Sequence, residues 1–325
     1  MNPNMRISCS LGSMLKIPEV FECARILNMT KIETIWVPET WGMENFSILG
    51  GISTINANQN LGSSIINIFS RSPATIAMGA VSIDTISKGR MILGLGTSSV
   101  PIVESFHGYG FEKPLQRMRE YVEIIKLIAS GKSINYSGKI FNLKNFKLLI
   151  KPNRDSIPIY IAAINKKMVE LTWEIADGTI FYLRPKMEMK DTISKMQSKR
   201  KIDVTCQIIT AISNDSEKAI ERAKKTLAFY VAVGKIYREF MADNGFRKET
   251  NEIFEEYNKS GFSQLHEFVS DSMLNEFTIS GTPEECKKQL ISFQNLGIDL
   301  PIIQFNPVED TIDSLKLLKK TLFED

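Results

Sequence analysis

The hydrophobic pattern of the chain alternates between short apolar runs and longer amphipathic segments. Residues 61–69 (LGSSIINIF) and 91–96 (MILGLG) are apolar runs of strand length, and residues 73–87 carry apolar side chains at helical spacing. Pro73 lies where a helix can begin, and Lys88-Gly89 lies where it can end. This order predicts a βαβ unit, whose two parallel strands lie in one sheet.

The same alternation continues along most of the chain. Strands are predicted at residues 5–10, 32–39, 61–69, 91–96, 157–163, 177–183, 202–213 and 300–307. Residues 115–131 form a clear amphipathic helix, and residues 134–150 a small hairpin around Ser137-Gly138. Eight strands alternating with helices predict an α/β fold, a (β/α)8 TIM barrel, as a single domain over residues 1–325. Segment 215–296 is mostly helical and too long for one crossover, so we predict a helical insertion between strands seven and eight.

A doubly wound sheet that binds a dinucleotide is the rival fold. It usually shows a fuller glycine fingerprint, and it rarely needs eight parallel strands. GLGTSS at residues 94–99 matches only the first two glycines of GxGxxG, and no acidic residue follows at a suitable place. We therefore reject the dinucleotide interpretation.

Composition narrows the class of protein. The net charge of +3 comes from interspersed residues of both signs, so no nucleic-acid partner is indicated. The four cysteines form no CxxC pair, and two histidines are too few for a histidine-rich metal centre, so we expect no metal site. We find neither a signal-peptide core nor a run of membrane-spanning length, and we expect a reduced, cytoplasmic protein without a membrane partner.

The carboxyl ends of barrel strands are where functional groups of this fold lie. Here those ends are small, hydroxylic or amide-bearing, and they carry few charges. They comprise Ser10, residues 39–41, 64–67, 96–99, 163–167 and 182–184, and Asn306. We find no Ser/His/Asp set and no closely spaced pair of carboxylates. Strand ends that carry so few acids and nucleophiles indicate that a bound organic cofactor carries the reaction.

One of these ends has the features of an anion site. Residues 162–167 (AAINKK) place a strand end at a helix N-terminus beside two lysines. Free N–H groups and the helix dipole would hold a phosphate there. The alternative is an ordinary Asn165 helix cap with solvated lysines.

Several segments resemble a known family. They are IWVPETWGMENFSILG (35–50), LGSSIINIFSRSPATIAM (61–78), KGRMILGLGTSS (88–99), FEKPLQRMREYVEIIK (111–126) and IPIYIAAINKKMVEL (157–171). Together they resemble the luciferase-like monooxygenase superfamily. More narrowly they are similar to its coenzyme F420-dependent oxidoreductases, a branch that includes methylenetetrahydromethanopterin reductase. The resemblance covers strands one to six continuously and strand eight loosely.

The resemblance implies a barrel that binds the deazaflavin F420 at its mouth. Members carry a non-proline cis peptide behind the deazaflavin ring, which by position would be Ser64–Ile65; a β-bulge with trans peptides is the alternative from the residues alone. The phosphate matches the turn at 164–167, with help from Arg184. The implied cofactor-binding residues are Ser63, Ser64, Ile65, Asn67, Gly96, Thr97, Ala163, Ile164, Asn165, Lys166, Lys167 and Arg184.

The general acid or base stays open in the sequence. Ser10 and Ser99 stand where some relatives have carboxylates. Glu39 and His107 are the catalytic candidates, with Glu104 behind them. His107 lies in a glycine-flanked loop (SFHGYG) that we expect over the barrel mouth, and histidine is a common general acid or base, although a histidine that only packs within the loop is an equal alternative.

Three functions follow from the resemblance. The first is an F420-dependent oxidoreductase that moves a hydride between C5 of the deazaflavin and a carbon of a small or pterin-like organic substrate. The second is an FMN-dependent monooxygenase of the same superfamily. The third is a non-catalytic protein that binds F420 or a flavin. Relatives often pair through barrel helices, which implies a homodimer or a higher homo-oligomer.

Overall fold

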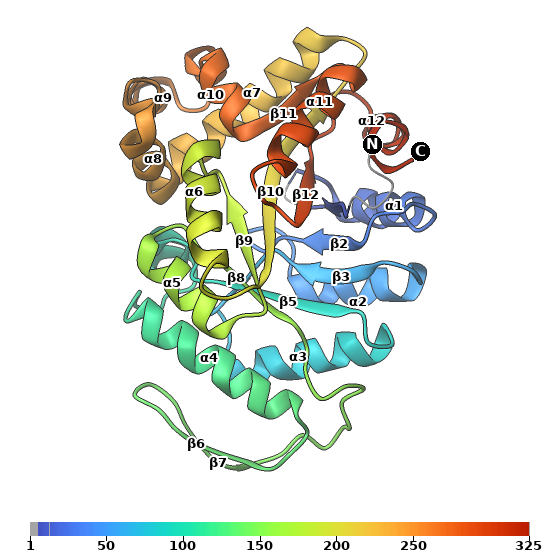
Figure 1. The fold of residues 1–325 in the computed structure, drawn as a ribbon, viewed down its shortest axis with the longest axis vertical. Helices are drawn as coiled ribbons and strands as arrows, with labels where there is room; N and C mark the ends of the chain where they lie inside the picture. Colours follow the sequence, from blue (N-terminus) through green and yellow to red (C-terminus); the bar gives the residue numbers. More distant parts are fainter. Residues whose placement is uncertain (1–5, 13, 325) are drawn as a thin grey trace.

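The computed structural model describes residues 6–12 and 14–324, and eight parallel strand positions form a closed barrel in it (Figure 1). Around the ring these are β1 (Ser8–Ser10), β2 (Thr34–Val37), β3 (Asn60–Ser63) with β4 (Ile66–Asn67), β5 (Met91–Gly96), β8 (Ile159–Ala162), β9 (Gly178–Tyr182), β10 (Asp203–Ile212) and β12 (Leu300–Phe305). β9 pairs with β10, β10 with β12, and β12 with β1, which closes the ring. The predicted (β/α)8 barrel is confirmed.

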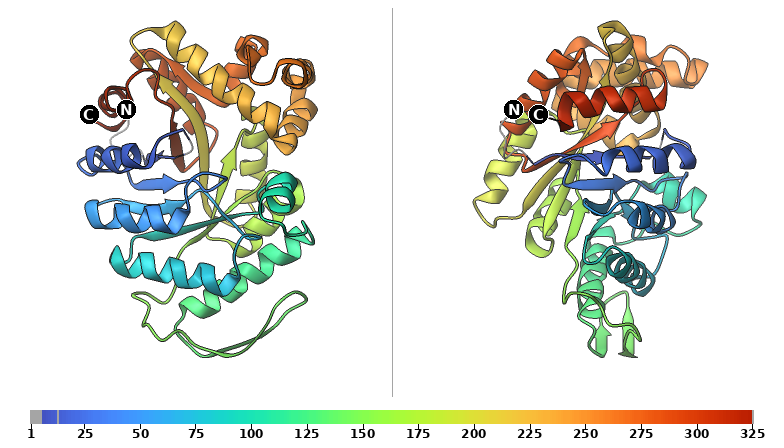
Figure 2. Two further views of the ribbon diagram at one scale, coloured as in Figure 1. Left: turned by 180° about the vertical axis from the view of Figure 1, so that it is seen from behind. Right: turned by 90° about the vertical axis from the view of Figure 1, so that its right-hand side faces the viewer.

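Helices surround the barrel on its outside, as Figures 1 and 2 show. They are α1 (Ile17–Leu27), α2 (Asn45–Ile55), α3 (Pro73–Ile86), α4 (Pro114–Ala129), α5 (Lys166–Ile175), α6 (Lys186–Gln197), α11 (Pro283–Gln294) and α12 (Thr311–Leu318). With helices on the outside and side chains filling the inside, β1, β2, β5 and β12 are buried at every position. This is why β5 reads as a continuous apolar run, and β2 and β12 as nearly continuous ones.

The third barrel position is not the single strand predicted at 61–69. It consists of β3 and β4, and the peptide bond between Ser64 and Ile65, which joins them, is cis. β3 pairs with the first half of β5, and β4 with its second half. The cis bond lies where the resemblance implies it, and the alternative of a bulge with trans peptides is not what the structure contains.

A second difference is α6, which no prediction covered. Its buried residues Met189, Ile193 and Met196 recur at helical spacing within a mostly polar segment. Four apolar residues in twelve, of which Met187 is exposed, are too few for the pattern to stand out.

The insertion is only partly the helical segment predicted at 215–296. It contains α7 (Ser216–Val233), α8 (Lys235–Met241), η2 (Ala242–Phe246), α9 (Arg247–Ser260), η3 (Leu265–Phe268) and α10 (Asp271–Phe277), but also a strand, β11 (Thr278–Gly281). β11 pairs in parallel with the end of β10, at Ile209–Ile212, beyond the part of β10 that pairs with β9. The pattern missed it because four residues, TISG, offer too short an apolar run. A second hydrophobic cluster, distinct from that under the barrel helices, joins α7, α9 and α10.

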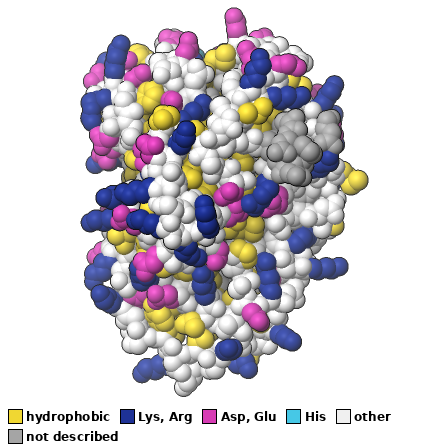
Figure 3. Space-filling view, in the orientation of Figure 1, with side chains coloured by type: hydrophobic (Ala, Val, Ile, Leu, Met, Phe, Trp, Pro, Cys, Tyr) yellow, Lys and Arg dark blue, Asp and Glu magenta, His cyan; other side chains and the backbone are white. Residues whose placement is uncertain are grey.

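Further elements lie on the surface of the barrel. They are the five-residue helices η1 (Ile102–Phe106) and η4 (Lys319–Phe323), and the predicted hairpin of β6 (Ile134–Ser137) and β7 (Asn142–Phe146). Lys, Arg, Asp and Glu are interspersed on the face that Figure 3 shows. Within 6–12 and 14–324, no helix combines the length and apolar character needed to span a membrane.

One buried carboxylate fastens the hairpin to α4. Glu120 is fully buried, and its oxygens accept hydrogen bonds from Gln116 Nε2 at 2.8 Å and from the N–H groups of Lys139 and Phe141 at 2.8 and 2.9 Å. Burial favours the neutral acid, but these hydrogen bonds outweigh it and hold the pKa of Glu120 below its ordinary value. The ionised form is therefore the one that stabilises the fold.

We expect this carboxylate to make the protein sensitive to acid. Because the pKa of Glu120 is lowered in the folded state, its contribution is complete above the ordinary pKa of 4.5 and is lost as the pH falls below it. Glu120→Gln should lower the free energy of unfolding at pH 7 by about 2 kcal/mol and flatten its pH dependence below pH 4.5. Urea denaturation at several pH values measures both. The control is Glu170→Gln, an exposed residue of α5 that should match the wild type; equal curves for both variants would contradict the prediction.

Candidate active site

A large pocket opens at the carboxyl ends of the barrel strands. Its volume is about 1410 Å3, the open mouth included. It is lined by Ser10, Gly12, Met14, residues 38–41, Ser64, Ile65, residues 96–99, Ile102, residues 162–165, Met168, Ile180, Tyr182, Gln207, Tyr230, residues 233–234, Ile236, Tyr237, Gln304 and Phe305. Barrel strands, their following loops and the insertion all contribute. This is the end of the barrel at which the sequence analysis places the chemistry.

Ser64, Ile65 and Gly96 form one wall of this pocket. A Cβ atom at Gly96 would lie 2.5 Å from Ile65 Cδ1, so the glycine leaves room for the Ile65 side chain in its present conformation. The buried Ser64 hydroxyl has no hydrogen-bond partner among the described residues. This wall therefore offers one unused polar group. Thr97, at the end of β5, also lines the pocket.

Two other predicted residues of this wall lie behind it. Ser63 Oγ donates to Gly94 O at 2.9 Å and accepts from Gly94 N at 2.8 Å, which clamps β3 to β5. Asn67 Oδ1 accepts from Phe69 N at 2.9 Å, whereas the buried Nδ2 has no partner in the described part of the chain. The structure does not bring either side chain into the pocket lining.

The predicted anion turn borders the same pocket. Ala163, Ile164 and Asn165 line it, and Asn165 caps α5 by accepting from Met168 N at 3.0 Å. Lys166 and Lys167 occupy the first turn of α5 and are exposed to solvent outside the lining.

Arg184 lies beneath this turn and faces away from solvent. Only 5% of the residue is exposed, and its Nη1 donates to Ile164 O at 2.9 Å. Its guanidinium also pairs with Glu188 and lies 4.8 Å from the centre of the Phe181 ring. The charge is therefore neutralised within the protein, and the visible role of Arg184 is to hold the turn from behind.

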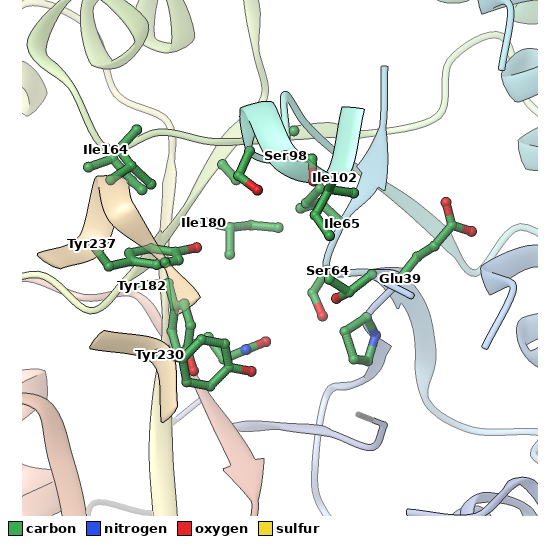
Figure 4. Close-up of a pocket in the computed structure, with 18 of the residues that line it drawn as sticks. Glu39, Ser64, Ile65, Ser98, Ile102, Ile164, Ile180, Tyr182, Tyr230 and Tyr237 are labelled. Atoms are coloured by element: carbon green, nitrogen blue, oxygen red, sulfur yellow. The ribbon is translucent and has the colours of Figure 1, made fainter. Parts of the chain in front are cut away.

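Glu39 is the one carboxylate among the described residues that line the pocket, and no Lys, Arg or His lines it in that part of the chain. Its two oxygens accept from Arg71 Nη1 and Nη2 at 2.7 and 2.8 Å, and one also accepts from Asn45 N at 2.9 Å. Figure 4 shows the carboxylate directed away from the tyrosines across the pocket. The structure thus places Glu39 at the pocket but engages its carboxylate elsewhere.

His107 lies outside the pocket. It borders a neighbouring hollow that also contains Arg71 and Glu44, and its ring packs edge-on against Phe106, 5.0 Å between centres. Glu104, the weaker candidate, accepts from Phe111 N at 3.2 Å within the same loop. The glycine-flanked loop therefore does not bring His107 over the mouth as the sequence analysis expected, because its first residues form the helix η1.

A cluster of tyrosines and glutamines lies opposite the Ser64–Ile65 wall, and of its members only Tyr182 was included among the predicted strand ends. Figure 4 shows Tyr182, Tyr230 and Tyr237 gathered on that side of the pocket. The Tyr182 ring stands nearly perpendicular to the other two, at 5.2 and 5.6 Å between centres. Burial, and next the neighbouring Tyr230, raise the pKa of Tyr182 well above its ordinary value.

The two glutamines come from barrel strands. Gln207 Nε2 donates to Gln304 Oε1 at 3.2 Å, and both residues are nearly buried. A single glutamine within each apolar run, at 202–213 and 300–307, is a signal that could have identified them. Tyr230 and Tyr237 lie in the insertion, where no comparable signal exists.

The lining therefore consists of neutral groups around one engaged carboxylate. No group of three His, Cys, Asp or Glu residues that could hold a metal ion occurs in 6–12 or 14–324. Hydroxyls, amides, aromatic rings and small side chains can bind and orient an organic molecule, but they supply no electrons for a redox step.

Comparisons with known proteins agree with this fold. The chain is 28% identical over 300 residues to 5,10-methylenetetrahydromethanopterin reductase of Archaeoglobus fulgidus, covering 88% of this chain and 89% of the relative. It is 27% identical over 316 residues, 88% and 90% of the two chains, to a Mycobacterium tuberculosis protein whose name assigns it provisionally to the coenzyme F420-dependent oxidoreductases.

A solved structure has the same fold over nearly its whole length. It is the coenzyme F420-dependent tetrahydromethanopterin reductase of Methanopyrus kandleri, with a TM-score of 0.87, 21% identity and 98% of each chain covered. The model of the luciferase-like monooxygenase family matches residues 4–300. The chain therefore belongs to the luciferase-like monooxygenase family.

Proposed function

We propose that this oxidoreductase uses coenzyme F420 and transfers a hydride between C5 of the deazaflavin and a carbon of a small organic substrate. The observation that carries the proposal is the neutral pocket, which is built to hold an organic redox group and contains no free acid, base or metal set among its described lining residues. The names of the Mycobacterium tuberculosis relative and of the Methanopyrus kandleri structure, which both mention coenzyme F420, favour F420 as that group.

The residues present fit a flat ring system. Ser64, Ile65 and Gly96 would lie against its face, since they form one wall of the pocket. The unpartnered Ser64 hydroxyl would hydrogen-bond to its polar edge. When bound, F420 supplies or accepts the hydride at C5.

The phosphate of F420 would lie at residues 164–167. There the N-terminus of α5 offers free N–H groups, and the exposed Lys166 and Lys167 add positive charge. Arg184 acts on this site through the carbonyl of Ile164 and not by direct contact. It is thus a positioning residue in our proposal.

The protein's own contribution to the reaction is orientation and shelter from water. The tyrosine side and the Ser64–Ile65 side face each other across the pocket (Figure 4). The space between them would hold two flat molecules together, the cofactor and the substrate. Glu39, fixed by Arg71 and Asn45, anchors the loop after β2 that forms the rim. We propose this anchoring as its role, and none for His107 in proton transfer.

Binding of the cofactor tests the proposal directly. The protein should bind F420 at micromolar or lower concentration and at least tenfold more tightly than FMN, because the name of the Mycobacterium tuberculosis relative mentions coenzyme F420 and not FMN. Fluorescence titration of each cofactor measures the affinities, and a single turnover of reduced F420 with candidate acceptors measures hydride transfer. Preferential binding of FMN would overturn the choice of cofactor.

Two other functions have support in the same observations. The family takes its name from monooxygenases, which favours an FMN-dependent monooxygenase as the second candidate. The engaged Glu39 carboxylate keeps a non-catalytic F420-binding protein as the third. F420 bound without hydride transfer to any acceptor would favour the third over our proposal.

A further inference from the structure

Besides the Ser64 hydroxyl, two polar atoms in the pocket wall lack a hydrogen-bond partner within the described part of the chain. They are the Tyr182 hydroxyl and Gln207 Oε1, and both are buried. Tyr182 and Gln207 are direct register partners on β9 and β10, so their side chains leave the sheet on the same side, and both line the pocket. A buried polar group without a partner is unfavourable, which makes the pair a site for a ligand that satisfies both atoms.

The surroundings hold both atoms in place. Gln207 Nε2 is used by Gln304 Oε1, at 3.2 Å, which leaves Oε1 as the open acceptor. The rings of Tyr230 and Tyr237 flank the Tyr182 ring, both nearly perpendicular to it. A donor and an acceptor therefore face the same pocket from paired positions of neighbouring strands.

The complement of this pair is a group with an acceptor and a donor on neighbouring atoms, such as the C=O and N–H of a lactam. It must be uncharged, because no cationic side chain and only the engaged Glu39 line the pocket in the part that the structure describes. The aromatic rings beside the pair favour a flat ligand.

We propose that Tyr182 and Gln207 form a subsite for the lactam edge of a planar, uncharged heterocyclic substrate. The Tyr182 hydroxyl donates to the ring carbonyl, and Gln207 Oε1 accepts from the ring N–H. This rests on the proposed function in one respect: the molecule bound here is the one that exchanges a hydride with F420. The pair belongs to the substrate because it lies across the pocket from the Ser64–Ile65 wall (Figure 4).

Three ring compounds of similar size test the subsite. 2-Quinolinone has both lactam groups, 1-methyl-2-quinolinone lacks the N–H, and quinoline lacks the lactam. We expect 2-quinolinone to bind the wild type about tenfold more tightly than the other two, as measured by calorimetry with and without F420. Tyr182→Phe and Gln207→Met should each remove most of this preference and change the affinity for F420 less than twofold. Tyr257→Phe, on α9 outside the pocket lining, is the control and should bind all four compounds like the wild type.

The outcomes separate the subsite from the function. Equal affinity of the wild type for the three ring compounds, or no binding of any, overturns the subsite. If Tyr182→Phe and Gln207→Met lose as much affinity for F420 as for 2-quinolinone, the pair contacts the cofactor. That result also overturns the substrate subsite. Absence of F420 binding to the wild type overturns the proposed function instead, and the titrations without F420 still report on the lactam preference.

Discussion

Gly94→Ala is expected to lower the free energy of unfolding by about 3 kcal/mol or more, the largest effect on stability that we predict. A Cβ atom at Gly94 would lie 1.9 Å from the carbonyl oxygen of Ser63 and 3.0 Å from Ile180 Cδ1. The first contact involves backbone, which cannot rotate away as a side chain can. Because β3 and β5 belong to a closed ring, their separation also strains the neighbouring strand pairs. Urea denaturation at pH 7 measures the change.

The control for Gly94 is a glycine with room for a methyl group. A Cβ atom at Gly50, within α2, would make an ordinary contact of 3.5 Å with Ile83 Cδ1. Gly50→Ala should therefore keep or raise stability, by about 0.5 kcal/mol, since alanine favours helix. A Gly94→Ala protein as stable as the wild type would show that β3 and β5 separate easily.

The fold could be predicted largely because barrel strands are buried on both sides. The run at 91–96 is β5 as predicted, since all six of its residues are buried and no polar residue interrupts the pattern. The third barrel position could not be read in this way. Residues 61–69 look like one strand in hydrophobicity, and only the resemblance to a family indicated the interruption at Ser64–Ile65.

Site residues at the ends of barrel strands could be predicted from the sequence. Those whose positions depend on how loops and the insertion pack could not. Gly96 and Ile164 line the pocket because the first ends β5 and the second comes two residues after β8. The positions of His107 and Tyr230 depend on how a loop and an insertion fold back, which no local pattern encodes. Arg184 is an intermediate case: its pairing with Glu188, four residues later, is a spacing that could have been noticed.

The second large effect concerns the phosphate turn, where Arg184 and Lys167 should behave differently. Arg184→Gln is expected to weaken F420 binding by about 10- to 100-fold, with little dependence of that factor on salt between 0.05 and 0.5 M. Its guanidinium is buried and paired with Glu188, so the loss acts through the released carbonyl of Ile164 and the displaced turn. Lys167→Gln is expected to weaken binding only a few-fold at low salt and not at all at 0.5 M, because an exposed charge is screened.

Fluorescence titration of F420 across this salt range distinguishes the two mechanisms. Lys190→Gln, an exposed lysine of α6 away from the turn, corrects for the change in net charge. If the Arg184→Gln factor shrinks with salt as the Lys167→Gln factor does, the guanidinium faces the phosphate directly and the positioning role is wrong. If instead only Arg184→Gln also loses thermal stability without F420, the buried pair supports the turn before any ligand binds. That order is what a preorganised site requires, because the energy needed to order the turn is then supplied by folding and not by the cofactor.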